Sequence, residues 1–545
     1  MNLSTRTRGD SEADLRTQVY LPSDVKLEPL CCGWYAYPNL VAPAQLAFNL
    51  AFRFVPMLES FLRNPRVHEV ASRDPNMLGG PFINVPRERL DEVRCLLDTT
   101  RDRAAGLLAF AHSYRALDEK LQVGADAACL DRFYEDLPSE ISGLLEIVYD
   151  SNHYALIRLI EPLLYAGGLD YARTHSIMAH RVPDRLREMF ISTPNLPAAD
   201  RIEFRLSFRD PRIDLLSALK HQGVSLGAIR DMSLAAAGEE GWRKLETWLT
   251  HERPQRREPA YHGQGVRVRY FGHACVLLQT AEVSILVDPL LALERNTPET
   301  LTFDDLPDEI DYIVISHAHP DHLLPEVLLQ LRRRAKQIVI PGNQKGNIVD
   351  PSLQLIMREL GYENIRVVEP LDRIPIPGGW ILSLPFSGEH CGLDIGAKQA
   401  VAVSLKDRSF VLLVDSEGVD PGLYGRLAPF VPPADLLFLG MECHGAPASW
   451  SYAPMMTKPI PRAADLTRRA SGANNKRAWD IIQHLPSAEV CVYAMGMEPW
   501  ARYLLGLEYA PESIQMQESD AFISQCRGAG MRASRLNGSR EWLFG

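Results

Sequence analysis

A seven-residue stretch carries four side chains whose types and spacing suit two metal ions. The stretch 316–322 reads SHAHPDH and directly follows the apolar run DYIVI, which predicts a buried strand. In an extended segment residues i and i+2 point to the same side, so His317 and His319 can bind one ion. Asp321 and His322 follow where the chain turns towards a helix, and we expect them to face a second ion beside the first.

Two metal ions held side by side repel each other and need carboxylates around and between them. Two acids stand at the ends of later predicted strands, Glu389 after WILSLPFSG and Asp415 after FVLLV. We assign Asp415 to the bridge between the ions. A single acid or histidine at a strand end is more often structural, but the spacing HxHxDH after a strand is typical of a metal site. The predicted ligands are three histidines and three carboxylates: His317, His319, Asp321, His322, Glu389 and Asp415.

The elements that must position these ligands are short strands. From Val266 onward, short β-branched or apolar runs alternate with turn residues, and two helical stretches, LPEVLLQLRRR and NKRAWDIIQHL, interrupt them. Strands with intervening helices predict sheets covered by helices, and an αββα sandwich is one solution.

The amino-terminal half has a different pattern. Two short runs, 18–21 and 202–208, are typical of strands. Helical spacing of apolar residues recurs in four stretches: 43–64, 87–122, 138–165 and 213–250. We therefore predict a helix-rich α+β domain. The polar run HERPQRREPAYHGQG between the halves predicts a boundary, so the expected domains are residues 1–262 and 263–545.

Length and composition limit the class of protein. A chain of 545 residues exceeds what one core usually supports, and 46% apolar with 23% charged residues is typical of globular domains. The net charge of -11 spreads over both halves, which argues against nucleic acid as a partner. Nine cysteines without a CxxC pair indicate a reduced, cytoplasmic chain. No signal-peptide core and no run of about 18 apolar residues occurs, so we expect no membrane partner.

These motifs resemble two known families. HxHxDH with Asp415 farther on looks like the signature of the metallo-β-lactamase superfamily, and VRVRYFGHACVLLQT with VDP at 287–289 resembles its opening hairpin. Most members of that superfamily have a histidine where this chain has Glu389. GWYAYPNLVAP and GGPFINV near the start, GMECHGAP at 440–447 and YAMGMEPW at 493–500 resemble the diiron β-hydroxylase family known from chloramphenicol biosynthesis. That similarity runs through nearly the whole chain.

The resemblance implies a non-haem diiron monooxygenase that uses dioxygen as co-substrate. A carboxylate at Glu389 in place of an imidazole hardens the ligand set, which favours iron or manganese over zinc, and the resemblance selects iron. By this resemblance the first histidine pair and Glu389 would bind one iron, Asp321 and His322 would bind the other, and Asp415 would bridge them. The late histidine that usually supplies a sixth superfamily ligand has no counterpart in YAMGMEPW.

The resemblance also implies partners. The substrate would be an aminoacyl group tethered as a thioester to a carrier domain of a nonribosomal peptide synthetase and hydroxylated at its β-carbon. Electrons would come from a separate reductase, because the sequence has no GxGxxG after a strand, no ferredoxin-like cysteine set and no haem motif. The amino-terminal domain would contribute to a homodimer and to docking of the carrier.

The main alternative is a hydrolase with two zinc ions that attacks a lactone, thioester or phosphodiester. HxHxDH alone favours that alternative, whereas Glu389 and the amino-terminal resemblance favour the oxygenase. A scaffold with a degenerate centre conflicts with the intact motif.

Several other residues near the motif have open roles. We expect His273 in a turn or behind the ligands, and His390 on the side opposite to Glu389, because neighbours in an extended chain alternate. Cys443 is expected to be a small buried filler. Three polar residues could replace the missing late histidine: Glu442, His444 and Glu498. Three arginines could contact an acidic helix of the carrier, but we predict an ordinary solvated face for them: Arg53, Arg63 and Arg66.

Overall fold

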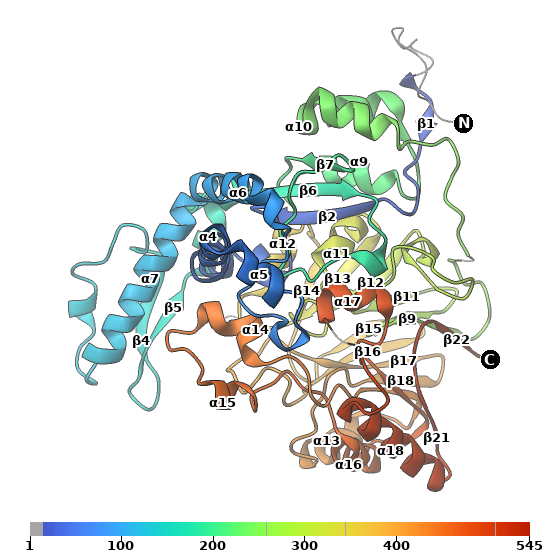
Figure 1. Ribbon diagram of the computed structural model, residues 1–545. Coiled ribbons are helices and arrows are strands. Elements are labelled where there is room, and N and C mark those ends of the chain that lie inside the picture. Colours follow the sequence, from blue (N-terminus) through green and yellow to red (C-terminus); the bar gives the residue numbers. More distant parts are fainter. Residues whose placement is uncertain (1–14, 258, 344, 507) are drawn as a thin grey trace.

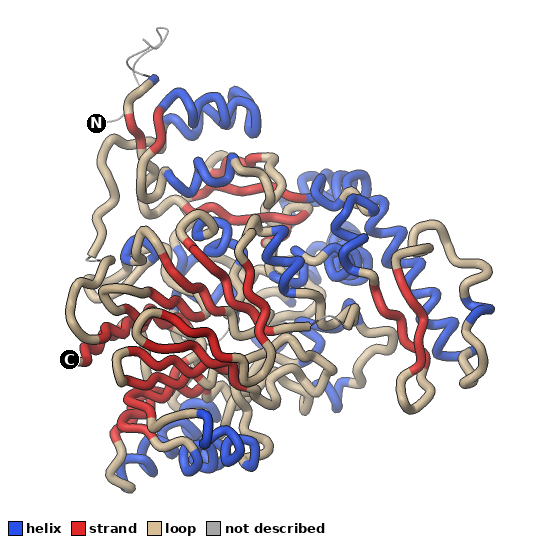
Figure 2. The backbone as a smooth tube through the Cα atoms, turned by 180° about the vertical axis from the view of Figure 1, so that it is seen from behind, coloured by secondary structure: helices blue, strands red, loops and turns tan. Residues whose placement is uncertain are grey.

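The carboxy-terminal half is a sandwich of two sheets with helices on both outer faces. The computed structural model describes residues 15–257, 259–343, 345–506 and 508–545. Figure 2 shows the strands of this half as two stacked layers. Apolar side chains from both sheets, such as Val268, Val287, Val403 and Phe438, meet in one buried layer between them. The predicted αββα sandwich is confirmed.

The first sheet contains seven strands in the order β14-β13-β12-β11-β10-β9-β22. Strands β11 to β14 run parallel, whereas β10 pairs antiparallel with both β9 and β11. Every residue of β11 is buried, as expected for a strand covered on both faces. The strands are β9 (Val266–Gly272), β10 (Cys275–Gln279), β11 (Ser284–Val287), β12 (Ile310–Val314), β13 (Ala335–Pro341), β14 (Ile365–Val368) and β22 (Arg540–Phe544).

The second sheet also contains seven strands, in the order β15-β16-β17-β18-β19-β20-β21. The first four pair antiparallel, and β18 to β21 run parallel. The strands are β15 (Arg373–Ile376), β16 (Gly379–Leu384), β17 (Ala400–Leu405), β18 (Arg408–Leu412), β19 (Ala434–Gly440), β20 (Ser487–Tyr493) and β21 (Arg532–Arg535).

Both helices predicted for this half are present. α11 (Pro325–Leu331) begins with a proline, which the first helical turn tolerates because its N–H has no partner there. α16 (Asn475–His484) begins after Asn474, whose side chain accepts a hydrogen bond from Arg477 N. α11 and α12 (Leu353–Glu359) pack outside the first sheet, and α13 (Gly422–Leu427), α16 and α18 (Ile514–Gly528) pack outside the second.

The amino-terminal half is built on a four-stranded antiparallel sheet in the order β3-β2-β6-β7. Its strands are β2 (Lys26–Cys31), β3 (Trp34–Tyr35), β6 (His175–His180) and β7 (Arg201–Phe204), and β1 (Gln18–Val19) pairs separately with β8 (Val224–Ser225). The main helices are α3 (Pro43–Asn49), α4 (Val55–Arg63), α5 (Pro65–Ala71), α6 (Leu90–Arg103), α7 (Ala105–Gly124), α9 (Arg212–Ala218) and α10 (Leu226–Glu246). The helix-rich α+β prediction is confirmed.

The helix predicted over 138–165 is wrong. This segment forms a hairpin of β4 (Leu145–Tyr149) and β5 (Ala155–Leu159), which lies beside α7 in an arm at one side of the molecule (Figure 1). Burial in β5 alternates strictly between buried and exposed residues. The apolar residues of this short run fit both the two-residue spacing of a strand and the 3.6-residue spacing of a helix. Packing against α7 stabilises the strand.

The two halves share one apolar core. The largest cluster of buried side chains includes Trp34 and Phe54 from the amino-terminal half, Leu286 and Ile313 from the first sheet, and Leu324 directly before α11. The described residues between Thr250 and Val266 contain no helix or strand. The boundary after residue 262 stays a prediction. None of the described helices has both the length and the apolar character needed to cross a membrane.

Candidate metal centre

The two sheets bring together the loops that carry the predicted ligands. The motif 316–322 follows β12, and Asp415 follows β18, and both strands belong to the parallel part of their sheets. Such strand ends are the usual position of functional loops. Gln399 N donates to Ser316 O at 2.9 Å, which ties the second sheet directly to the motif.

His317, His319 and Glu389 form one compact buried group. Nδ1 of His319 lies 2.5 Å from Oε1 of Glu389, and Nε2 of His317 lies 3.7 Å from its Oε2. Glu389 has a φ of +72°, a left-handed conformation that costs about 1 kcal/mol or more in a residue other than glycine. The surrounding structure therefore holds this carboxylate against its backbone preference, as is common at functional sites.

Asp415 lies between the two groups of predicted ligands. Its Oδ2 is 2.9 Å from Nε2 of His322 and 3.8 Å from Nε2 of His317. Asp321 Oδ2 is 3.5 Å from Nε2 of His322 on the other side. The structure thus brings all six predicted residues into one cluster, with Asp415 at the position that a bridge requires. Their role as ligands stays a prediction.

A cavity of about 90 Å³ opens beside these carboxylates. The amino-terminal half contributes Tyr37 and residues 189–191 to its wall, and the carboxy-terminal half contributes Trp450 and residues 504–505. Asp321, Glu389 and Asp415 also line it. A small molecule in this cavity would therefore contact apolar side chains from both halves and the acidic cluster at once.

Comparison with known proteins identifies the family. Residues 20–253 match the family model described as the diiron non-heme beta-hydroxylase N-terminal domain, and residues 267–387 match a beta-lactamase superfamily domain. The chain is 32% identical over 529 residues to the Streptomyces venezuelae 3-hydroxylase of 4-amino-L-phenylalanyl on the CmlP peptidyl-carrier protein. This match covers 95% of the chain and 98% of its relative. The chain belongs to the diiron β-hydroxylase family.

The fold of the family extends over the whole chain. The crystal structure of CmlA, a diiron beta-hydroxylase from Streptomyces venezuelae, superposes with a TM-score of 0.89 at 30% identity, covering 97% of this chain and 100% of that one. A metal-dependent hydrolase of Desulforamulus reducens is 36% identical over only 58 residues, which is 11% of this chain and 23% of the hydrolase. The diiron β-hydroxylase resemblance is confirmed, and the chain is an oxygen-dependent hydroxylase with a diiron centre.

The donor set of the cluster fits the two irons of the family. Nε2 of His317 is buried without a hydrogen-bond partner among the described residues, between carboxylate oxygens 3.7 and 3.8 Å away. A buried unpaired nitrogen is costly, and a bound metal ion would satisfy it. Burial, followed by the charge of His322, lowers the pKa of His317 well below its usual value, so its lone pair is free for a metal. Carboxylates beside imidazoles suit iron.

Asp288 and Ser316 fix which nitrogen two of these histidines present. Nδ1 of His322 lies 2.9 Å from Asp288 Oδ2, and Nδ1 of His317 lies 2.9 Å from Ser316 Oγ. Ser316 Oγ in turn donates to Asp288 Oδ2 at 2.6 Å. Both Nε2 atoms therefore face the cluster. Neither support belongs to the predicted ligand set, although the acid directly after β11 is a sequence signal that could have found Asp288.

Asp288→Asn should weaken metal binding about 10- to 100-fold, because an amide nitrogen in place of Oδ2 no longer accepts from His322 and Ser316. Competition with a chelator measures this affinity. The matched control is Asp311→Asn near the start of β12, away from the ligand motif. Asp311 accepts hydrogen bonds from Ser284 and Lys336 outside the site. Equal affinities for both variants would contradict the orienting role of Asp288.

Tyr452 and His390 hold the remaining histidine of the motif. Nε2 of His319 lies 2.8 Å from the Tyr452 hydroxyl and 3.2 Å from Nδ1 of His390, so its Nδ1 faces Glu389. His390 Nδ1 also lies 2.9 Å from Glu389 Oε2. The prediction that His390 points away from Glu389 was wrong, because the positive φ of Glu389 breaks the alternation of an extended chain. No pattern in the sequence marked Tyr452, which is 133 residues from His319.

His273 and Glu498 support the far side of the cluster. His273 stands in a turn with a φ of +47°, and its Nε2 lies 3.0 Å from Asp321 Oδ2. Glu498 Oε1 accepts from His273 N at 2.7 Å and from the Tyr270 hydroxyl at 3.0 Å. Glu498 therefore stabilises the turn that carries His273, and its side chain makes these contacts away from the motif histidines.

The segment after β19 contributes one acid to the cavity. Glu442 lines the cavity, and burial, followed by the charges of Asp321 and Asp415, raises the pKa of its carboxyl well above the usual range. His444 is exposed, and Cys443 is only half-buried. The prediction of Cys443 as a buried filler was wrong, because the loop after the strand lies at the surface.

The solvated face predicted for the three arginines holds for Arg63 and Arg66, which are exposed, but is wrong for Arg53. A π-helical turn (Leu50–Phe54) between α3 and α4 carries Arg53, whose guanidinium donates to the carbonyl oxygens of Ser449, at 3.0 Å, and Trp450. Arg53 thus ties the amino-terminal half to the cavity wall at Trp450.

Proposed function

We propose that this hydroxylase inserts oxygen at the β-carbon of an aminoacyl group tethered as a thioester to a carrier domain of a nonribosomal peptide synthetase. The carboxylate of Glu389 beside His317 and His319 is the observation that carries the proposal, because it replaces the imidazole typical of the zinc hydrolases. The relative that acts on carrier-bound 4-amino-L-phenylalanyl supports the substrate class.

We assign the metal ligands from the same cluster. His317, His319 and Glu389 would hold one iron, Asp321 and His322 would hold the other, and Asp415 would bridge them. When bound, the diiron centre supplies the oxidant for an unactivated C–H bond, which no amino-acid side chain can provide.

The protein's own side chains bind and orient the substrate. Phe190, Trp450 and Leu504 present apolar surface beside the cluster and exclude water from the reacting atoms. Glu442, on the same wall, offers a carboxyl group that can form a hydrogen bond with the amino group of an aminoacyl substrate. Together these contacts would hold the β-carbon towards the acids of the metal centre.

Hydroxylation consumes dioxygen, two electrons and two protons, and it yields the alcohol and water. We propose that the electrons come from a separate reductase, since the chain carries no motif for a redox cofactor beyond the metals. We also propose a cytoplasmic homodimer that comprises an amino-terminal domain (1–262) and a catalytic domain (263–545). All nine cysteines are free thiols, which supports a reducing compartment.

The decisive experiment loads candidate aminoacyl groups onto the cognate carrier domain and adds chemically reduced enzyme with oxygen. We expect a mass gain of one oxygen atom on the tethered amino acid and about two irons per chain by elemental analysis. A free amino acid that reacts equally well would contradict the tethered substrate. Ester cleavage by a zinc-loaded enzyme without oxygen would favour the hydrolase instead.

A further inference from the structure

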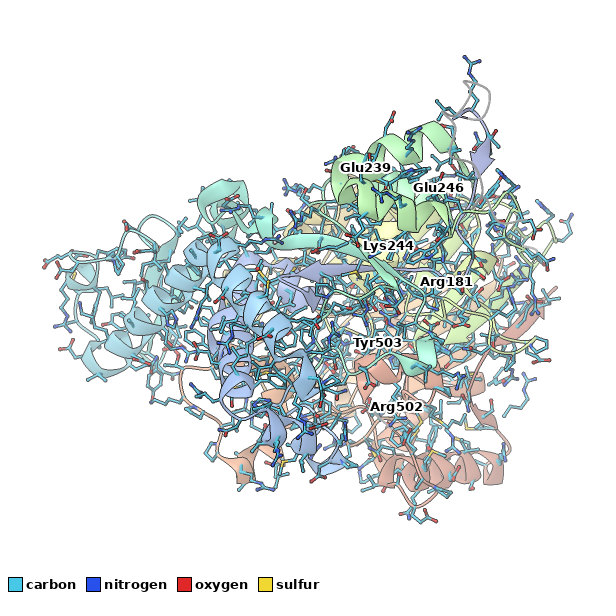
Figure 3. The ribbon with its side chains drawn as sticks, turned by 45° about the horizontal axis from the view of Figure 1, so that its top comes forward. Arg181, Glu239, Lys244, Glu246, Arg502 and Tyr503 are labelled. Carbon is cyan, nitrogen blue, oxygen red and sulfur yellow. The ribbon has the colours of Figure 1, made fainter. Side chains whose placement is uncertain are left out.

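Behind the cavity wall lies a group of buried polar side chains that we call the Arg187 cluster. Each residue is at most 9% exposed, and the members come from two strands and a loop of the amino-terminal half and from two helices of the carboxy-terminal half. Tyr503, on α17 (Arg502–Leu505), can be located in Figure 3 between the amino-terminal strands and the carboxy-terminal part of the ribbon. The cluster consists of Glu28 of β2, Tyr35 of β3, Arg187, Glu326 of α11 and Tyr503.

One guanidinium joins all the other members. Nη2 of Arg187 lies 2.7 Å from Glu28 Oε1 and 2.8 Å from Glu326 Oε2. The guanidinium carbon is 3.6 Å from the ring centroid of Tyr503 and 5.4 Å from that of Tyr35. Both tyrosine hydroxyls donate to the same oxygen of Glu326, at 2.8 Å from Tyr35 and 3.3 Å from Tyr503. A buried ion pair adds little net stability, but removal of one partner leaves a buried charge uncompensated.

Three members of this cluster directly adjoin the catalytic site. Arg187 precedes the wall residues 189–191, and Tyr503 precedes the wall residues 504–505. Phe190 N donates to Tyr503 O at 3.0 Å, which links the two wall segments. Glu326 stands in the first turn of α11, four residues after His322. The two wall segments and the loop of predicted ligands therefore meet at one arginine.

We propose that Arg187 is a positioning residue for hydroxylation: it fixes both wall segments relative to the loop of metal ligands and thereby sets where the substrate's β-carbon lies. The inference rests on the proposed function. In the coupled reaction one atom of dioxygen enters the C–H bond, and the other leaves as water with two electrons and two protons from the reductant. Without alignment of the β-carbon, the same electrons and protons reduce dioxygen to hydrogen peroxide.

Arg187→Met in the full-length, iron-loaded enzyme tests the proposal. Hydroxylated product per dioxygen consumed should fall about tenfold, with a matching rise in hydrogen peroxide and unchanged iron content. Arg187→Lys, which keeps the charge but loses the stacking on Tyr503, should restore part of the coupling.

The matched control is Arg332→Met at the other end of α11. Arg332 has a side chain only 2% exposed, and it contacts Asp214 and the carbonyl oxygens of Phe208 and Asp210, which lie outside the cavity wall. This variant should lose stability like Arg187→Met but keep wild-type coupling. Equal uncoupling in both arginine variants would overturn the positioning role.

Hydrogen exchange gives a readout that needs no substrate. The Phe190 amide should exchange about tenfold faster in Arg187→Met than in Arg332→Met, because its bond to Tyr503 O loses the support of the guanidinium. Wild-type exchange at Phe190 together with wild-type coupling in Arg187→Met would refute the inference. A third outcome separates the two ideas. If Phe190 exchanges faster in Arg187→Met but the wild-type enzyme hydroxylates no carrier-bound group, the proposed function is refuted and the positioning geometry stands.

Discussion

Asp415→Ala should retain fewer than two irons per chain and should hydroxylate at least about 1,000-fold more slowly, a loss of roughly 4 kcal/mol of transition-state stabilisation. Asp415 Oδ2 lies within 4 Å of Nε2 of both His317 and His322, so its removal takes away the anion between the two predicted ion positions. Even two unit charges about 4 Å apart repel by roughly 4 kcal/mol at an effective dielectric constant of 20, and divalent ions repel more. The second ion should therefore leave.

Elemental analysis of iron per chain and product formation in a single turnover measure this effect. Glu417→Gln is the matched control, because Glu417 lies two residues from Asp415 but pairs with Arg477 instead of the histidines. The control should keep two irons and wild-type product. An Asp415→Ala enzyme with two irons and normal turnover would show that another group bridges the metals.

Glu389→His should change the metal that the chain selects and should lower hydroxylation at least about 100-fold. An imidazole in place of the carboxylate removes one negative charge beside His317 and His319 and softens the ligand set towards zinc. The backbone tolerates this change better than most, because histidine is enriched among non-glycine residues with positive φ, and Glu389 has a φ of +72°. Loss of activity should therefore reflect the ligand set and not a misfolded loop.

Metal analysis after growth with iron and zinc together, followed by assay of the carrier-bound product, tests this change of metal selectivity. We expect zinc to exceed iron in Glu389→His, and iron to exceed zinc in the wild type and in Glu417→Gln. A Glu389→His enzyme that keeps its iron and its full product yield would mean that this carboxylate does not determine the chemistry.

Sequence patterns next to predicted strands were enough to find the residues of the cluster, including those far apart along the chain. HxHxDH after a buried strand and the acids at two later strand ends identified the six residues that meet in the cluster, because strand ends of a layered sheet are brought to one edge. The supports came from elsewhere: Tyr452 approaches His319 from 133 residues away. No periodicity reports such a contact.

Backbone conformation explains most of the errors. His390 lies beside Glu389 and not opposite to it, because a single residue with positive φ turned the chain. The hairpin β4–β5 replaced a predicted helix, because short apolar runs carry both periods and only the packing partner decides between them. Arg53 is bound to the cavity wall through a local widening of its helix, which residue types do not indicate.

The cavity wall is contributed by both halves of the chain, with Tyr37 and residues 189–191 on one side and Trp450 and residues 504–505 on the other. Selectivity for one amino acid over another is consequently a joint property of two sequence-distant regions. Grafting the iron-binding half of one relative onto the amino-terminal half of another would combine two mismatched surfaces and would not transfer substrate choice. A substitution in one part of the wall changes the fit of the substrate against the other part. We therefore expect the wall residues of the two halves to change together during evolution.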